Sequence, residues 1–303
     1  QLWMTPISSE MRNPLSAIVH CADWIGTSLS QFDCDPNDVI IPRDVIEGYA
    51  DATETIVLCA QHQKRIIDDV LTLSKLDSDL LMITPIDVQP VSTIQASLKM
   101  FDVEIQNSDI DLRFQVDKSY AELAVDWVKL DPSRLLQVLI NLVTNAIKFT
   151  MAESRRKIVI HLGASREPPT IGSIEYLPRT SNRRDMTKGS AWGTGKPVYL
   201  HIEVQDSGRG LDEVERTLLF KRFSQASPRT HVQYGGSGLG LFICRQLTEL
   251  QGGQIGVTSS VGVLVLASAV VVSVVLVTAS EVVGSTVVVG STVVVGSTVV
   301  VGS

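Results

Sequence analysis

The sequence predicts an α+β protein in which a helical hairpin precedes an α/β sandwich. Two long segments before residue 82 carry apolar residues at helical spacing and are joined by a polar stretch, as in a hairpin. From Thr84 to about Gly256, strand-like and helix-like segments alternate with glycine-rich turns, which is typical of a sheet with helices on one face. Pro85 and Pro90 mark the boundary, so we expect units at residues 1–82 and 83–267.

The predicted hairpin begins with a helix over residues 1–32, which Asn13-Pro14 is expected to kink because proline lacks an amide donor. A polar stretch from Asp33 to Pro42 leads to a second helix with a heptad seam, interrupted by a polar Gln63. The apolar or small seam residues are Ile56, Cys59, Ile66, Val70 and Leu73. One hairpin buries little surface, so the seam predicts a homodimer with a four-helix bundle; the alternative is a seam closed within one chain.

The predicted sandwich contains a helix from Asp131 to about Phe149 and strands at Lys157–Gly163 and Val198–Gln205. Between the two strands, about residues 165–197, lies a stretch rich in Pro, Gly, Ser and Arg with little apolar material. We expect this stretch to be a mobile surface insertion.

Composition narrows the class of protein. A net charge of −7 over 303 residues argues against a nucleic-acid or anionic-membrane surface. The four cysteines show no C-x-x-C pair and no histidine at zinc spacing, which favours a reducing compartment. The chain opens with glutamine and lacks a signal segment, so we expect a cytoplasmic fragment of a longer protein.

The first chemical motif lies on the helix after Asp131. Asn141 and Asn145 are four residues apart and share a helix face, with Lys148 about one turn further along. Two amides and an ammonium group at one place suit magnesium and phosphate oxygens. Asparagine pairs are also common on helix surfaces, so this motif alone is not decisive.

Two further motifs follow the second strand. In Asp206-Ser-Gly208-Arg-Gly210, the glycines allow the backbone close to a flat ligand, and the carboxylate can accept from an exocyclic amine. The same letters also describe an ordinary β-turn. In Leu219-Phe220-Lys-Arg-Phe223, the aromatic residues either anchor a lid or fill the core.

The fourth motif, Gly235-Gly236-Ser-Gly238-Leu-Gly240, opens an apolar helix. A glycine-rich turn at a helix start offers backbone donors and the positive dipole end to phosphates. Neither a Walker loop nor a G-x-G-x-x-G fingerprint is present in the sequence. Each motif is moderate evidence, and four in this order are strong evidence for nucleotide binding.

In this order the four motifs resemble the N, G1, F and G2 boxes of the histidine-kinase ATP-binding domain, whose fold is of Bergerat type. Ser9-Glu10-Met-Arg-Asn13-Pro14 resembles the H-box that precedes that domain, and the insertion is similar to one in fungal hybrid-type kinases. The resemblance makes residues 1–82 a dimerisation and phosphoacceptor hairpin, and residues 83–267 the ATP domain.

The resemblance also implies roles for residues. Asp206 binds the adenine amine, Asn145 holds Mg²⁺, and Asn141 and Lys148 support the phosphates of ATP. Phe220 and a set of glycines shape the nucleotide pocket and its lid: Gly208, Gly210, Gly236, Gly238 and Gly240. In the family, Glu10 acts as general base and Asn13 places the phosphate.

The H-box departs from the family at its acceptor. Ser9 stands where the family has histidine, and a serine hydroxyl is a poor nucleophile without strong activation. We therefore expect autophosphorylation at this position to be disabled. His20 shares the helix face with Ser9 but lies about 16 Å further along, so we do not expect it to replace the acceptor.

The C-terminal segment is the second departure. A valine-rich, uncharged stretch follows Gly262 and gives way to six-residue Val-Val-Val-Gly-Ser-Thr repeats. Hydropathy allows a membrane helix over Val261–Ala279, valine density favours β structure, and the period permits a solenoid. We favour a non-native tail over residues 268–303, with the chain to about Ala267 forming the last strand.

Together these features predict the core of a two-component sensor histidine kinase, a homodimer that would deliver phosphate to a response-regulator receiver domain. The core itself should contact neither nucleic acid nor membrane. The alternative is an ATP-binding, dimerising pseudokinase without phosphotransfer. A related ATPase, such as a chaperone or mismatch-repair protein, would lack the H-box-like hairpin.

Overall fold

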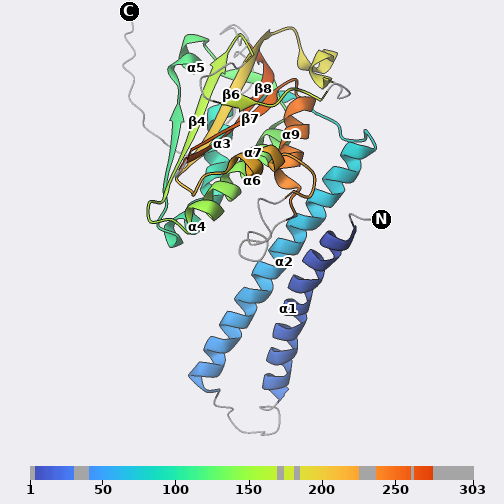
Figure 1. Ribbon diagram of the computed structural model, residues 1–303, viewed down its shortest axis with the longest axis vertical. Helices are drawn as coiled ribbons and strands as arrows, with labels where there is room; N and C mark the ends of the chain where they lie inside the picture. Colours follow the sequence, from blue (N-terminus) through green and yellow to red (C-terminus); the bar gives the residue numbers. More distant parts are fainter. Residues whose placement is uncertain are drawn as a thin grey trace, which may run out of the picture.

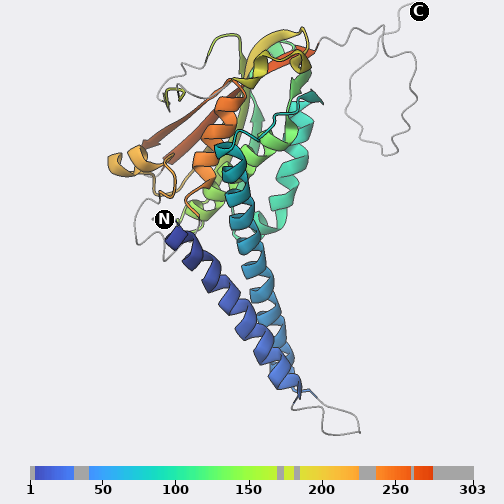
Figure 2. The ribbon, with the colours of Figure 1, turned by 90° about the vertical axis from the view of Figure 1, so that its right-hand side faces the viewer.

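The computed structural model describes residues 4–30, 41–168, 174–180, 185–224, 237–260 and 263–275, with side chains described outside residues 4–12 and 260–275. A long helical hairpin projects from a sandwich of one sheet and several helices (Figure 1). Only the C-terminal half of the second hairpin helix lies against the sandwich (Figure 2). This arrangement confirms the predicted fold class.

The hairpin consists of α1 (Met4–Ser30) and α2 (Arg43–Asp77), which pack along each other. Pro14 lies inside α1, and the helix continues on both sides of it. Of the predicted seam, Ile66 and Leu73 are buried, while the other members are half-buried. Other large apolar side chains of both helices stay exposed, among them Leu15, Val19, Trp24, Leu58 and Leu71. Of the predicted linker, residues 33–42, all but the last two lie outside the described residues.

The sheet follows the order β1-β3-β8-β6-β4-β2; β7 pairs with residues 263–269 of β8 on the edge opposite β6, and β5 pairs with β7. Its strands are β1 (Ile86–Val88), β2 (Asp111–Val116), β3 (Trp127–Leu130), β4 (Lys157–Ser165), β5 (Glu175–Tyr176), β6 (Lys196–Asp206), β7 (Gln254–Ser260) and β8 (Val263–Val275). The β2–β4 pair is parallel, and the other described pairs are antiparallel. The predicted strands in residues 157–163 and 198–205 correspond to β4 and β6.

Helices cover one face of this sheet. The main ones are α3 (Pro90–Leu98), α6 (Pro132–Thr150) and α9 (Gly240–Leu250); α6 packs on β4 and β6, and α9 on β7 and β8. Shorter elements are η1 (Lys99–Phe101), α4 (Asp102–Asn107), α5 (Lys118–Glu122), η2 (Met186–Lys188), η3 (Ser190–Trp192) and α7 (Glu213–Leu218). Within the described part of the chain, no helix combines the length and the hydropathy needed to cross a bilayer.

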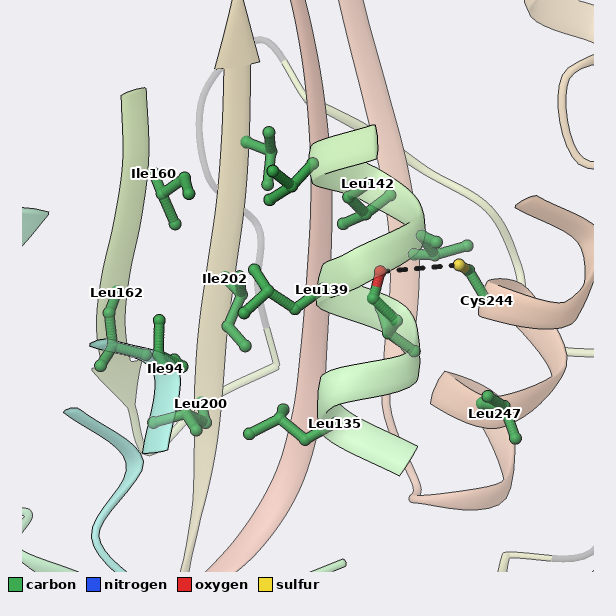
Figure 3. Close-up of a cluster of buried hydrophobic side chains, with 14 of the residues drawn as sticks. Ile94, Leu135, Leu139, Leu142, Ile160, Leu162, Leu200, Ile202, Cys244 and Leu247 are labelled. Atoms are coloured by element: carbon green, nitrogen blue, oxygen red, sulfur yellow. Dashed lines mark hydrogen bonds between the residues drawn. The ribbon is translucent and has the colours of Figure 1, made fainter. Parts of the chain in front are cut away.

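The core forms between α6 and the sheet, because apolar residues alternate along the strands and recur at helical spacing on α6. Leu135, Leu139 and Leu142 of α6 point toward strand residues that include Ile160, Leu162, Leu200 and Ile202 (Figure 3). The Asp131 side chain caps α6, accepting from the Arg134 N–H, and it also accepts from the Thr84 N–H at 2.8 Å. Asp131 thereby fixes the start of α6 to the chain that leads out of the hairpin.

The described part of the insertion buries more apolar material than its composition suggests, whereas its mobility stays a prediction. In its described part, β5 pairs with β7, and Trp192 is only 4% exposed. Leu177 and Met186 also pack against the core. These apolar residues are spaced too widely to form a periodic pattern, which explains why their burial was not predicted from the sequence.

The last strand also differs from its predicted end near Ala267. Strand β8 continues to Val275, pairs with β6 along its length, and meets β3 through Ser273, Val274 and Val275. The long strand β6 offers partners for residues 264–274, and β-branched valine suits that pairing. Residues 263–275 are therefore strand and not membrane helix, whereas the repeats lie outside the described residues.

Candidate functional site

The N-box residues lie on α6 where that helix meets α9. Asn141, Asn145 and Lys148 are all half-buried. An ideal Cβ atom built on Gly240 would lie 3.4 Å from Asn141 Oδ1, so the first residue of α9 passes directly against Asn141. Four residues further, the buried Cys244 thiol donates to the Val138 carbonyl oxygen at 3.8 Å (Figure 3). The first and fourth motifs are thus in contact.

The G1 carboxylate is deeply buried. Asp206 ends β6, is 3% exposed, and accepts a hydrogen bond from the Gly208 N–H at 2.8 Å. Burial raises the pKa of Asp206 to about 7, although the Gly208 N–H lowers it in part. This carboxyl group therefore titrates near neutral pH.

Gly208 brings the G1 turn against the N-box helix. A Cβ atom at this position would lie 2.8 Å from Asp206 Oδ1 and 3.2 Å from the Phe149 carbonyl oxygen. Ser207 supports the same turn, accepting from the Lys157 N–H and donating to the Arg155 carbonyl oxygen. The turn leaves no room for a side chain, which is the geometry expected where a backbone approaches a flat ligand.

The remaining G1 and F-box residues form a supporting layer. Gly210 has a φ of +77°, a left-handed conformation that favours glycine. Arg209 pairs with Glu215, which closes a capping box with Asp212 at the start of α7. Phe220 is 4% exposed and belongs to the core cluster, so the core-filling alternative describes its packing, and its role in nucleotide binding stays a prediction.

The G2 turn fits between two neighbours. Gly238 has a φ of +62°, and a Cβ atom there would lie 3.0 Å from the Phe223 carbonyl carbon and from the Ser224 oxygen. Gly240 opens α9 against Asn141. Gly236 lies outside the described residues. The described residues of the four motifs therefore come together at one end of the sandwich.

The structure adds contacts from α2 that the sequence analysis missed. Ser237 Oγ donates to Asp69 Oδ2 at 2.8 Å, and Arg222 forms a bidentate ion pair with Asp77. Burial and the nearby cations of Arg65 and Lys148 lower the pKa of His62. A signal for Asp69 existed in the sequence, since it is an acidic residue on the buried stripe of α2 between Ile66 and Leu73.

The H-box residues lie on α1. Ser9 and Glu10 fall in its first turns, but their side chains are outside the described part, and Asn13 and His20 are exposed. Their predicted roles stay predictions. Among the described residues, no group of three or more His, Cys, Asp and Glu side chains is placed to hold a metal ion. A magnesium ion here would rely on amide oxygens and on the phosphates of a bound nucleotide.

Comparison with known proteins gives a consistent result. Residues 130–295 match the family described as "Histidine kinase-, DNA gyrase B-, and HSP90-like ATPase". The chain is 30% identical over 261 residues to "Hybrid signal transduction histidine kinase A" of Dictyostelium discoideum, covering 86% of this chain and 10% of that protein. It is 29% identical over 260 residues to "Histidine kinase 5" of Arabidopsis thaliana, covering 85% of this chain and 25% of that protein. The chain thus spans a tenth to a quarter of these relatives.

Solved structures show the same fold. The Acinetobacter baumannii histidine kinase AdeS matches with a TM-score of 0.52 and 16% identity, covering 86% of this chain and 96% of that one. Full-length ShkA in complex with AMPPNP matches with a TM-score of 0.53 and 19% identity, covering 76% of this chain and 40% of that one. Both matches extend beyond the residues that the family match covers.

Proposed function

Because the chain belongs to the histidine kinase-, DNA gyrase B- and HSP90-like ATPase family, we propose that it is the ATP-binding and dimerising core of a hybrid-type sensor histidine kinase. One observation carries this proposal above the others: the buried Asp206 lies at a turn that Gly208 holds against the N-box helix. A buried carboxylate beside a glycine backbone suits recognition of an adenine amine. The cytoplasm, where ATP is abundant, is the compartment in which we expect this core to work.

The residues present fit Mg²⁺-ATP. Asp206 would accept from the exocyclic amine of adenine, and the glycines at 208 and 210 would let the ring approach the backbone. Asn145 would give its amide oxygen to Mg²⁺, while Asn141, Lys148 and the backbone donors of the G2 turn at Gly236, Gly238 and Gly240 would face the phosphates. When bound, the nucleotide supplies the phosphoryl group and the metal neutralises its charge. The protein contributes position and electrostatics.

The acceptor is where we expect this chain to differ from an active kinase. In the family pattern, a histidine before Glu10 attacks the γ-phosphate, and Ser9 takes that position here. An alcohol beside an ordinary carboxylate stays protonated at neutral pH and reacts poorly. We therefore propose that nucleotide binding is retained and that histidine autophosphorylation is lost.

A second function follows from the same observation. A chain that binds ATP and dimerises without an acceptor would act as a pseudokinase or scaffold. Dimerisation is compatible with both the kinase and the pseudokinase function. The exposed apolar residues of α1 and α2 favour a second copy of this chain as the partner. By the resemblance, a response-regulator receiver domain would dock on the hairpin.

The deciding experiment incubates radiolabelled ATP with the chain, with its Ser9→His variant, and with Ser9→Ala as a control. Label on the Ser9→His variant alone, acid-labile and alkali-stable, is the expected result. If all three proteins bind ATP and none takes label, the pseudokinase function is the better one. Label on the parent chain would show that Ser9 does not disable it.

A further inference from the structure

A carboxylate of the hairpin reaches the glycine-rich turn that opens α9. Asp69 is 8% exposed, and its Oδ2 accepts from Ser237 Oγ at 2.8 Å. The same hydroxyl accepts from the N–H of Leu239, the N-cap residue of α9, at 3.3 Å. A hydrogen-bonded chain therefore runs from the N–H of the N-cap residue through Ser237 to a buried carboxyl group of α2. Burial raises the pKa of Asp69, and the Ser237 hydroxyl and the Arg65 cation lower it in part.

The place that Asp69 occupies is one that favours negative charge. Helix α9 has eleven residues, so its N-terminus presents unsatisfied N–H groups and the positive end of the helix dipole. The negative charge of Asp69 also raises the pKa of Cys244, in the first turns of α9, after the larger effect of burial. An anion close to these first turns fills the electrostatic role that a phosphate group fills at such helix starts.

A second contact holds the same arrangement. Asp77, eight positions further along α2, forms a bidentate ion pair with Arg222, whose guanidinium also lies 4.8 Å from the centre of the Phe242 ring. The two carboxylates thus tie α2 to residues on both sides of the segment 225–236. The Arg222 pair is exposed, at 41% and 46%, so it orients the helix more than it stabilises it.

We propose that Asp69 is an intramolecular competitor of the nucleotide phosphates, so that docking of α2 on the sandwich weakens ATP binding. This inference rests on the proposed function. Phosphate oxygens at the G2 turn and the Asp69 carboxylate would be like charges at one helix terminus, and the Ser237 hydroxyl that donates to Asp69 could not donate to a phosphate at the same time. Because coupling between two binding events is reciprocal, ATP in turn displaces Asp69 and loosens α2 from the sandwich. A hairpin that must move to meet the phosphate would be freed by the nucleotide itself.

The test measures dissociation constants of Mg²⁺-ATP and of adenosine for the full chain and for its Asp69→Asn and Asp68→Asn variants. Asp68 is the adjacent, exposed carboxylate and controls for net charge. We expect Asp69→Asn to bind ATP about tenfold more tightly, within the usual range of coupling between sites. Adenosine, which lacks phosphates, should bind the three proteins alike, and Asp68→Asn should match the parent chain for both ligands.

A second measurement follows hydrogen exchange of the α2 amides around Asp69. We expect ATP to speed this exchange in the parent chain and adenosine to leave it unchanged. Equal ATP affinity of Asp69→Asn and Asp68→Asn, or weaker ATP binding by Asp69→Asn, would overturn the inference while leaving the proposed function standing. Absence of ATP binding by every variant that melts cooperatively would overturn the proposed function and the inference with it.

Discussion

At the scale of single residues, the burial of Asp206 favours ligand binding but disfavours its own charged form. Its carboxyl is nearly inaccessible to water, and its one described hydrogen bond comes from the Gly208 N–H. A carboxylate buried this way favours its protonated form, which is why its pKa rises to about 7. The same burial leaves the group ready to accept from a ligand amine in a site with little competing water. Residues with such shifts concentrate at functional sites.

Replacing Asp206 with asparagine should abolish ATP binding and remove a pH dependence of stability. The folded-state pKa is raised from 3.8 to about 7, so the native state keeps a proton that the unfolded chain releases. The stability from this group is therefore fully present below about pH 4 and is lost as pH rises to about 7, by at most about 4 kcal/mol. Urea unfolding at several pH values measures this pH dependence of the free energy of unfolding. Equal pH slopes for the parent chain and Asp206→Asn would contradict this assignment.

Gly208 allows a sharper steric test. In Gly208→Ala, the new methyl would overlap Asp206 Oδ1 and press on the Phe149 carbonyl, so we expect at least tenfold weaker ATP binding and about 1–3 kcal/mol less stability. Gly189→Ala is the matched control, because the nearest atom to its Cβ would be the Met186 oxygen at 3.9 Å. Calorimetric titration and thermal melting check both variants. Similar behaviour of the two variants would argue against the close packing of the G1 turn.

At the scale of elements, the insertion and α9 form one structural unit. Arg245 Nε donates to Glu249 Oε1 at 2.8 Å, and its Nη2 donates to the Pro178 carbonyl oxygen of the insertion at 2.9 Å. Arg179 of the insertion also donates to the Glu249 carbonyl oxygen of α9 at 3.0 Å. The insertion thus covers the C-terminal end of the helix whose N-terminus forms the G2 turn.

Two ion pairs with the same sequence spacing should differ in their contribution to the stability of the fold. Arg245–Glu249 and Arg43–Glu47 are both i,i+4 pairs, but the carboxylate side chains are 2% and 64% exposed. Arg245→Ala leaves a buried carboxylate without its cation, so we expect a loss of about 3 kcal/mol. Arg43→Ala should leave the unfolding midpoint unchanged. Chemical denaturation compares them, and equal midpoints would show that the Glu249 contact carries no stability.

The sequence predicted elements well where periodicity was strong. The bounds of α6, β4 and β6 were close to those observed, because each alternates or recurs at a clear period. The contact between Asn141 and Gly240 was not predictable, since it depends on how α6 and α9 pack. The burial of Trp192 and the extent of β8 were missed because both depend on partners distant in sequence: the core that covers Trp192, and β6 and β3 for the strand.

At the scale of the whole molecule, a hairpin arm projects from the sandwich and leaves apolar surface uncovered (Figures 1 and 2). Leu58 is 59% exposed and Leu71 53% exposed on α2, and Leu15 is 52% exposed on α1. An arm with this many exposed apolar residues on both helices is typical of a protein surface that binds a partner. Burying both sides of the hairpin in a four-helix bundle would cover them.

Dimerisation through the hairpin gives the last prediction. A Leu58→Glu, Leu71→Glu double variant should raise the dissociation constant of the dimer at least tenfold. Each new glutamate would have to bury its charge in an apolar interface, which opposes association. Val103→Glu is the control, since Val103 is 70% exposed on α4, away from the hairpin. Sedimentation equilibrium should give a dimer for the parent chain and the control, and a larger monomer fraction for the double variant. Monomers in all three proteins would mean that another partner covers the hairpin, and a dimer of the double variant would place the interface elsewhere.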